Sequence, residues 1–336
     1  RIFINWRLFG RGCGVFYMNK LKSPIAVVWE ITNNCNYKCP HCRAYMSNFS
    51  EDVNLENKII EKIIENDILS VNISGGEPLV NPRIVSIVSR LTKANIDVGI
   101  SSNGWLFSKI GKELVDNGLS FLQVSLDGPK ELHDSFRGVD GAYERAIEAL
   151  KYAKSLGLRT QMNVTITSRN LSTLMYNLDV ANEIGIDRIF YRRVVPAGKG
   201  KENISLLPPK EEYLRKILEL SKIHSETLDI AIDDPILPIL MMKDGANVNN
   251  DRMSCTAGVK SIGIDSNGVV YPCIFLREKI GDFHEDDFST IWNNSPILEK
   301  LRNRDFYKCG KCEFNYICGG CRAYSGIFEK DEMCPL

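Results

Sequence analysis

The sequence lacks several features that would point directly to a function. Its 42 lysine and arginine residues are balanced by 42 aspartate and glutamate residues, so there is no net charge to attract nucleic acid or an anionic membrane. No run of 18 apolar residues is present, which excludes a transmembrane helix of ordinary length. Residues 1–20 contain no uninterrupted apolar stretch, and we therefore expect no secretory signal peptide.

Histidine is scarce, with four residues, whereas cysteine is frequent, with 11. Apart from Cys13, the cysteines form an early group and a late group, at Cys35, Cys39 and Cys42 and at Cys255, Cys273, Cys309, Cys312, Cys318, Cys321 and Cys334. The odd number and uneven distribution argue against the disulfide framework of a secreted protein. Thiolates at such short spacings are typical ligands of zinc or of iron–sulfur clusters.

The early cysteines favour iron over zinc. A structural zinc site usually has four protein ligands, and this loop supplies three thiols. The nearest further candidate, His41, is adjacent to Cys42 and badly placed to bind the same ion. Polar neighbours such as Asn34 and Lys38 argue against three thiols buried in a core strand. Three thiolates suit a four-iron cluster whose fourth iron is open to a small molecule.

Strand and helix patterns alternate six times in the first 193 residues. Six strands are expected, at Ile25–Ile31, Leu69–Ile73, Asp97–Ser101, Phe121–Leu126, Thr160–Thr167 and Arg188–Arg193. A helical stripe of Leu55, Ile59, Ile60, Ile63 and Ile64 follows a candidate N-cap at Asn54, and Gly118, Gly157 and Gly185 are expected to end later helices. This alternation favours parallel strands in an α/β fold, here an open, partial (β/α)6 barrel of the TIM type.

Unusual residues cluster where the predicted strands end. The three-cysteine loop follows the first strand, and Gly75-Gly76-Glu77-Pro78 follows the second. Later strands end near Asn103, Ser125, Asp127, Asn163 and Arg192. Barrel active sites are built at this edge, so we expect these side chains to surround one site. Glycine at positions 75 and 76 would let the backbone approach a ligand closely.

Taken together, the Cys35-x3-Cys39-x2-Cys42 spacing and the Gly-Gly-Glu-Pro segment resemble the radical S-adenosylmethionine (SAM) superfamily, over roughly residues 25 to 230. The resemblance implies a [4Fe–4S] cluster on the three thiolates, with an open iron that chelates the amino and carboxylate groups of SAM. It also implies reductive cleavage of SAM to a 5′-deoxyadenosyl radical, which abstracts hydrogen from a substrate. An external electron donor of the ferredoxin or flavodoxin type is then required.

The resemblance also implies which side chains contact SAM. The expected contacts are the segment Gly75, Gly76 and Glu77 with the methionine amino group, Asn103 beside it, Ser125 and Asp127 with the carboxylate and ribose, Asn163 with the nucleoside, His41 with the adenine, and Arg137 with the carboxylate. For His41 the alternative is plain packing. For Arg137 the alternative is a solvated loop.

The late cysteines are similar to the SPASM module of radical SAM enzymes, which holds two auxiliary iron–sulfur clusters. Residues 262–273 are expected to form a hairpin with a turn at Asn267-Gly268, and Phe288–Arg302 a short helix. The resemblance implies one cluster on Cys309, Cys312, Cys318 and Cys334, and a second on Cys255, Cys273 and Cys321, which lacks a fourth thiolate. A zinc knuckle at residues 309–321 is the alternative. Only two residues separate Cys318 from Cys321, where the family commonly has three.

These observations divide the chain into an N-terminal arm (1–24), the barrel (25–235) and a cysteine-rich SPASM domain (236–336). The role of Cys13 stays open between an ordinary thiol, a cluster ligand and a hydrogen-atom donor. Because an open cluster is oxygen-labile and cytosolic thiols stay reduced, we expect a cytoplasmic protein.

Several substrates fit such an enzyme. The leading hypothesis is a ribosomally made peptide that undergoes crosslinking, epimerisation or oxidation. Because few residues precede the first strand, either a partner protein presents the peptide or the barrel rim binds it directly. The second is a tetrapyrrole of an alternative heme pathway, whose propionates Arg192, Arg193, Lys199 and Lys201 could hold. Sulfatase maturation is less favoured, since Ile274 and Ser261 stand where such enzymes carry an aspartate and a cysteine. A non-enzymatic electron carrier is the remaining class.

Overall fold

A computed structural model describes residues 21–43, 52–248, 255–306, 308–326 and 329–336. Predictions that involve residues 1–20, among them those for Cys13, lie outside the described residues. The proposed division into three segments remains a prediction.

One ten-stranded sheet curves through the molecule, and its seven N-terminal strands lie side by side in chain order, all parallel. These strands are β1 (Ala26–Glu30), β2 (Ser70–Ser74), β3 (Asp97–Ser102), β4 (Phe121–Ser125), β5 (Arg159–Ile166), β6 (Arg188–Arg193) and β7 (Asp229–Ile232). The six predicted strands are confirmed within one or two residues at each end. The short, partly exposed β7 extends the sheet beyond the predicted six.

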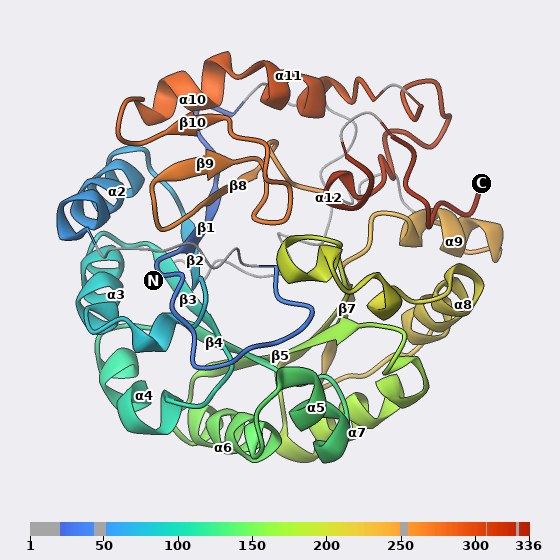
Figure 1. Ribbon diagram of the computed structural model, residues 1–336, viewed down its shortest axis with the longest axis horizontal. Coiled ribbons are helices and arrows are strands. Elements are labelled where there is room, and N and C mark those ends of the chain that lie inside the picture. Colours follow the sequence, from blue (N-terminus) through green and yellow to red (C-terminus); the bar gives the residue numbers. More distant parts are fainter. Residues whose placement is uncertain (1–20, 44–51, 249–254, 307, 327–328) are drawn as a thin grey trace.

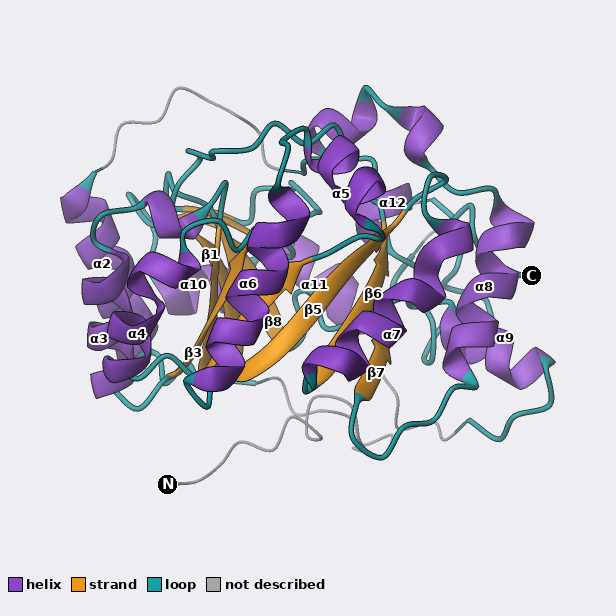
Figure 2. Cartoon of the chain, turned by 90° about the horizontal axis from the view of Figure 1, so that it is seen from below, coloured by secondary structure: helices purple, strands orange, loops and turns teal. Residues whose placement is uncertain are grey.

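Helices cover the outside of the curved sheet (Figures 1 and 2), as expected for a partial barrel. They are α2 (Val53–Glu65), α3 (Ile84–Lys93), α4 (Phe107–Asp116), α5 (Lys130–Arg137), α6 (Ala142–Ser155), α7 (Leu174–Ile184), α8 (Lys210–Ser221) and α9 (Leu237–Lys243), with 3-10 turns η1 (Pro78–Val80), η2 (Leu171–Thr173), η3 (Gly198–Lys201) and η4 (Ile204–Leu206). In the described part of the chain, no helix combines the length and apolarity needed to cross a membrane.

Two details of α2 differ from the sequence prediction. The N-cap is Asp52, whose carboxylate accepts hydrogen bonds from the backbone amides of Asn54 and Leu55, so Asn54 lies inside the first turn. Asp52 is a better N-cap than Asn54 here, because the negative charge of its carboxylate is favoured at a helix N-terminus. Ile59, Ile60 and Ile63 are buried as expected, but Ile64 is exposed at the edge of the stripe.

The C-terminal segment continues the barrel sheet. Strand β8 (Ser261–Ile264) pairs in parallel with β1, and β9 (Val269–Tyr271) and β10 (Gly281–Asp282) follow in antiparallel order. The predicted hairpin with its turn at Asn267-Gly268 is therefore confirmed. Through β8 the cysteine-rich segment lies directly beside the strand that leads into the three-cysteine loop.

The single helix expected at Phe288–Arg302 is two helices, α10 (Phe288–Asn294) and α11 (Pro296–Asn303). Pro296 has no amide hydrogen and forces the preceding residue out of the helical region. Ser295 is accordingly extended, and its hydroxyl caps α11 by accepting from the amide of Leu298. A last short helix, α12 (Arg322–Ser325), lies among the late cysteines.

Candidate active site

A cavity of about 380 Å³ lies inside the barrel, along strands β1 to β6 and against the segment that follows β9. Predicted site residues that line it are Cys35, Cys39, His41, Cys42, Gly75, Gly76, Glu77, Asn103, Ser125, Arg137 and Asn163. Asp127 is the exception among the predicted barrel residues. The expectation that these side chains surround one site is therefore met by all but one of them.

The three-cysteine loop places its thiols at the wall of this cavity. The amide of Tyr37 donates to the Cys35 sulfur at 3.4 Å, and the Cys39 thiol donates to the carbonyl oxygen of Arg137 at 3.7 Å. Burial raises the pKa of Cys35 to about 12 and also raises the pKa of Cys39. Such thiols become thiolates when a cation binds them, as iron or zinc does.

The described residues contain no group of three or more His, Cys, Asp or Glu side chains placed to hold one metal ion between them. Cluster ligands differ from the ligands of a single ion, because each thiolate binds an iron of its own. The three thiols at the cavity wall are a donor set of the kind that a cluster takes.

The Gly-Gly-Glu-Pro segment packs against the backbone of the cysteine loop. The amides of Gly76 and Glu77 donate to the carbonyl oxygens of Thr32 and Asn34, at 2.7 and 2.8 Å. A Cβ atom on Gly75 would lie 2.4 Å from the Thr32 oxygen, and one on Gly76 would lie 2.2 Å from the Asn34 oxygen. The close approach that requires glycine is therefore between two segments of this chain, whereas we had expected it toward a ligand.

Glu77 fastens this segment to the next strand. Its buried carboxylate accepts hydrogen bonds from the Ser102 hydroxyl at 2.8 Å and from the backbone amides of Asn103 and Leu79 at 2.7 and 3.0 Å. Burial raises the pKa of Glu77 to about 7. The Asn103 side chain donates in turn to Asn36 Oδ1 at 2.7 Å. The loops after β1, β2 and β3 are thus held together by one hydrogen-bond network.

Asp127 lies behind the cavity wall and holds Arg137. Arg137 Nε donates to Asp127 Oδ2 at 2.7 Å, and the amide of Thr165 donates to the other carboxylate oxygen at 2.9 Å. Burial alone would raise the pKa of Asp127, but Arg137 and His133 outweigh it and hold that pKa below its usual range. Arg137, which lines the cavity, is thereby fixed in place.

Several buried polar atoms at the cavity wall have no hydrogen-bond partner among the described residues. They include His41 Nδ1, Asn163 Oδ1 and the Tyr37 hydroxyl. His41 stacks on Phe136 with ring centres 3.9 Å apart, and burial lowers its pKa to about 3, so the ring is neutral. Unpaired buried polar groups are rare in folded proteins, which indicates that a polar ligand completes this wall. A ring nitrogen, an amide oxygen and a hydroxyl are groups that suit a nucleoside.

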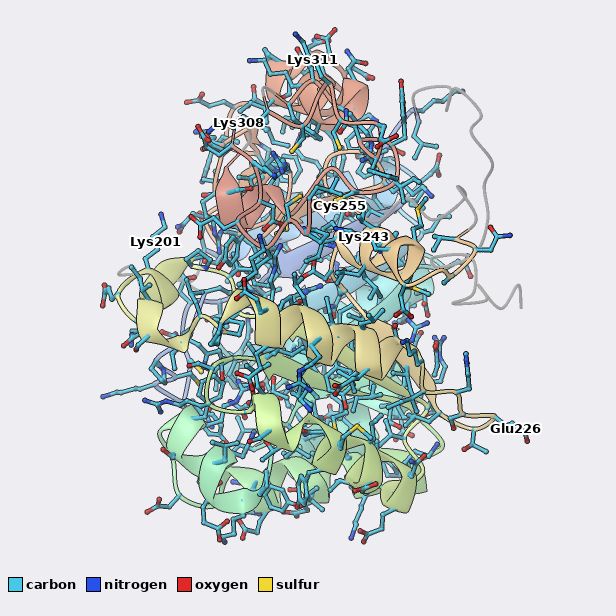
Figure 3. All side chains as sticks on the ribbon, turned by 90° about the vertical axis from the view of Figure 1, so that its right-hand side faces the viewer. Lys201, Glu226, Lys243, Cys255, Lys308 and Lys311 are labelled. Carbon is cyan, nitrogen blue, oxygen red and sulfur yellow. The ribbon has the colours of Figure 1, made fainter. Side chains whose placement is uncertain are left out.

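The late cysteines lie in two neighbourhoods. Burial raises the pKa of Cys255 to about 11 and that of Cys321 to about 12, and Cys255 interacts with both Cys273 and Cys321. Cys318, whose pKa burial also raises to about 12, interacts with Cys334. Which of the late cysteines share a cluster remains a prediction. Figure 3 shows Cys255 between the C-terminal segment and the barrel helices.

The predicted basic cluster separates into different environments. Arg193 is 2% exposed and pairs with Asp234 at 3.0 Å and with Asp331 at 2.9 Å, while Asp331 also accepts from the amide of Cys321 at 2.8 Å. This network ties β6 to the cysteine-rich segment. Arg192 and Arg193 both line the cavity, whereas Lys201 points away from the molecule (Figure 3). Lys201 therefore lies apart from the two arginines.

Sequence reasoning missed two residues at the wall, Arg43 and Phe275. Arg43 directly follows Cys42, and Phe275 is two residues after Cys273, with its amide donating to that sulfur at 3.4 Å. The sequence could have indicated both residues, because each lies within two residues of a predicted cluster ligand. Their meeting across the cavity depends on the pairing of β8 with β1, which no local pattern indicates.

The chain matches two family models. The model described as the radical SAM superfamily matches residues 29–179, and the model of an iron–sulfur cluster-binding domain, SPASM, matches residues 255–314.

The similar proteins are named for different pathways. The AdoMet-dependent heme synthase of Methanosarcina barkeri is 30% identical over 321 residues, which cover 90% of this chain and 92% of that protein. The subtilosin biosynthesis protein AlbA of Bacillus subtilis is 29% identical, covering 90% of this chain and 68% of that protein. Streptococcus suis SuiB, solved with its precursor peptide SuiA, superposes with a TM-score of 0.73 at 21% identity, covering 95% of this chain and 77% of SuiB.

Proposed function

The chain is an enzyme that belongs to the radical SAM superfamily and carries an iron–sulfur cluster-binding SPASM domain, and we propose that it removes a hydrogen atom from a residue of a peptide substrate. When bound to the three thiolates, a cluster with an open iron supplies the electron that cleaves SAM to methionine and the 5′-deoxyadenosyl radical. The observation that carries the proposal is the convergence of the cysteine loop, the Gly-Gly-Glu-Pro segment, Arg137 and unpaired polar atoms on one cavity.

The chain's own residues supply binding and orientation. Arg137, held by Asp127, presents a fixed guanidinium to the carboxylate of SAM. Asn163 and the neutral His41 ring offer their unpaired atoms and an aromatic face to the nucleoside.

The cavity can take one side chain of a peptide. At about 380 Å³ it lies near the lower end of the range of roughly 300–1,000 Å³ for ligand pockets. A peptide can insert one residue and leave its remainder outside the barrel. The relatives AlbA and the mycofactocin maturase MftC of Mycobacterium tuberculosis support peptide chemistry by their names.

Tetrapyrrole side-chain modification is a second candidate. It is supported by the heme-pathway relatives and by the arginines of the cavity wall, which suit propionate groups. In either case we propose two auxiliary clusters on the late cysteines and a one-electron donor of the ferredoxin or flavodoxin class. A partner protein that presents the peptide belongs to the first candidate alone.

The experiment is an anaerobic incubation of the reconstituted protein with SAM, a reductant, and either pooled synthetic peptides or an iron porphyrin with propionate side chains. We expect 5′-deoxyadenosine and a mass change in a peptide. A mass change in the porphyrin alone would select the second candidate. Reconstituted protein that holds iron but forms no 5′-deoxyadenosine would refute both.

A further inference from the structure

Arginine is the predominant charged residue of the cavity wall, although the whole chain is neutral. Five arginines line the cavity, Arg43, Arg137, Arg188, Arg192 and Arg193, whereas Glu77 is the one carboxylate of the described residues that does so. None of the carboxylates that pair with these arginines lines the cavity. Guanidinium groups are therefore the main charged groups that border the cavity.

Glu77 contributes little negative charge to this wall. Both of its oxygens accept hydrogen bonds from the neighbouring loops, and burial holds its pKa near 7. A cationic group entering the cavity would meet mainly like charge, and a carboxylate would meet opposite charge in a partly desolvated space, where charge interactions are stronger than in water.

Two of these arginines meet at a single aromatic ring. The guanidinium carbons of Arg43 and Arg192 lie 5.3 and 5.0 Å from the centre of the Phe275 ring. Arg43 comes from the cysteine loop, Arg192 from β6, and Phe275 from the segment that follows Cys273. The ring thus contacts two guanidiniums that come from different segments of the chain.

Each guanidinium keeps donors for a further partner. Arg43 uses Nη2 on the Ser74 hydroxyl at 2.9 Å and Nη1 on Glu30, and Arg192 uses Nε on Asp233 at 2.5 Å. Arg192 Nη1 makes no hydrogen bond within the described residues, and its side chain is 33% exposed, toward a cavity that it lines. A guanidinium with a free edge is suited to a carboxylate oxygen.

We propose that Arg43 and Arg192, held by Phe275, bind a carboxylate group of the substrate. The proposal rests on the proposed function and adds the chemical class of substrate that the site accepts. Arg137, on the other side of the cysteine loop, is the partner proposed for SAM itself. A carboxylate at Arg192 would hold the substrate between the three early cysteines and Cys273.

The test compares acids with their neutral counterparts. A peptide pool with glutamate at one fixed position is set against the same pool with glutamine, and an iron porphyrin with four propionates is set against its methyl ester. Retention by anaerobically reconstituted, SAM-loaded protein is measured by equilibrium dialysis and mass spectrometry. We expect the acid of at least one pair to bind about tenfold or more tightly than its neutral form.

Variants locate the contact. Arg43→Gln and Arg192→Gln should each weaken binding of the acid by roughly tenfold, as for loss of a charge-assisted hydrogen bond, and so remove most of the preference. Arg188→Gln is the matched control, because Arg188 begins the same strand β6, lines the cavity and pairs with the partly exposed Asp229. Arg192→Lys keeps the positive charge but lacks the planar guanidinium. This variant and thermal unfolding of all variants together test whether a loss of binding reflects a general loss of structure.

Three results would overturn the proposal: wild-type protein that binds neither acid, wild-type protein that binds acid and neutral forms equally, or an equal loss in Arg188→Gln. The pair that shows the preference identifies whether the carboxylate comes from a peptide or a tetrapyrrole. Iron content and 5′-deoxyadenosine formed without substrate are measured in parallel. They report on the proposed function independently of carboxylate binding.

Discussion

Replacement of Gly76 by alanine tests whether the contact between the Gly-Gly-Glu-Pro segment and the cysteine loop shapes the SAM site. The added Cβ atom would lie 2.2 Å from the carbonyl oxygen of Asn34 and 2.8 Å from that of Asn33, and both atoms belong to backbone that cannot rotate away. Since real Cβ atoms stay beyond about 3.0 Å, the two segments must separate by about 0.8 Å.

That separation strains two backbone hydrogen bonds, from the amides of Gly76 and Glu77. At about 0.5–1.5 kcal/mol each, their loss costs ~1–3 kcal/mol of unfolding free energy. The displacement also moves the cavity wall, and a shift near 1 Å at a binding site can cost roughly 100-fold in activity. We therefore expect Gly76→Ala to lower the melting temperature and to weaken SAM binding at least tenfold.

Gly185→Ala is the control. Gly185 ends α7 with a φ of 75°, and an added Cβ would meet nothing within 4 Å. Its expected cost is ~1 kcal/mol of backbone strain, with SAM affinity unchanged. Calorimetry of unfolding and titration with SAM measure both effects. If Gly76→Ala bound SAM as tightly as Gly185→Ala, the assignment of this contact to the SAM site would be wrong.

Three further predictions follow from the same geometry. Asp127→Asn leaves Arg137 buried without its counterion, so we expect a loss of ~3–5 kcal/mol in stability and weaker SAM binding. Denaturant unfolding and titration with SAM measure the two effects. Unchanged SAM affinity would show that Arg137 does not contribute to SAM binding. Because the pKa of Glu77 rises from 4.5 to about 7 on folding, the folded chain holds a proton that the unfolded chain releases, and the free energy of unfolding should fall as pH rises through this range; a wild-type profile parallel to that of Glu77→Gln would contradict this. Anaerobically reconstituted protein should contain about 12 iron atoms with matching sulfide, as for three four-iron clusters, whereas about four iron with one or two zinc would reassign the late cysteines to a zinc module.

Local patterns predicted the strands and several helix ends well. Gly118, Gly157 and Gly185 adopt the left-handed conformation at the ends of α4, α6 and α7, as their positions indicated. Such signals depend on a few neighbouring residues, which is why they are legible in sequence. The prediction of one helix at Phe288–Arg302 was wrong because Pro296 divides it, although the backbone restriction at proline is also a local signal.

The amino-acid sequence by itself determined the cysteine spacings, the order of the parallel strands and the loops that carry the site. These follow from short-range spacing and from the rule that parallel strands end at one edge. Only the tertiary structure decided that Gly76 packs on the cysteine loop, that Asp127 pairs with Arg137, and that Phe275 contacts both Arg43 and Arg192. Each of these depends on contacts between segments far apart in the chain, above all the pairing of β8 with β1, and such contacts are selected by the packing of the whole sheet.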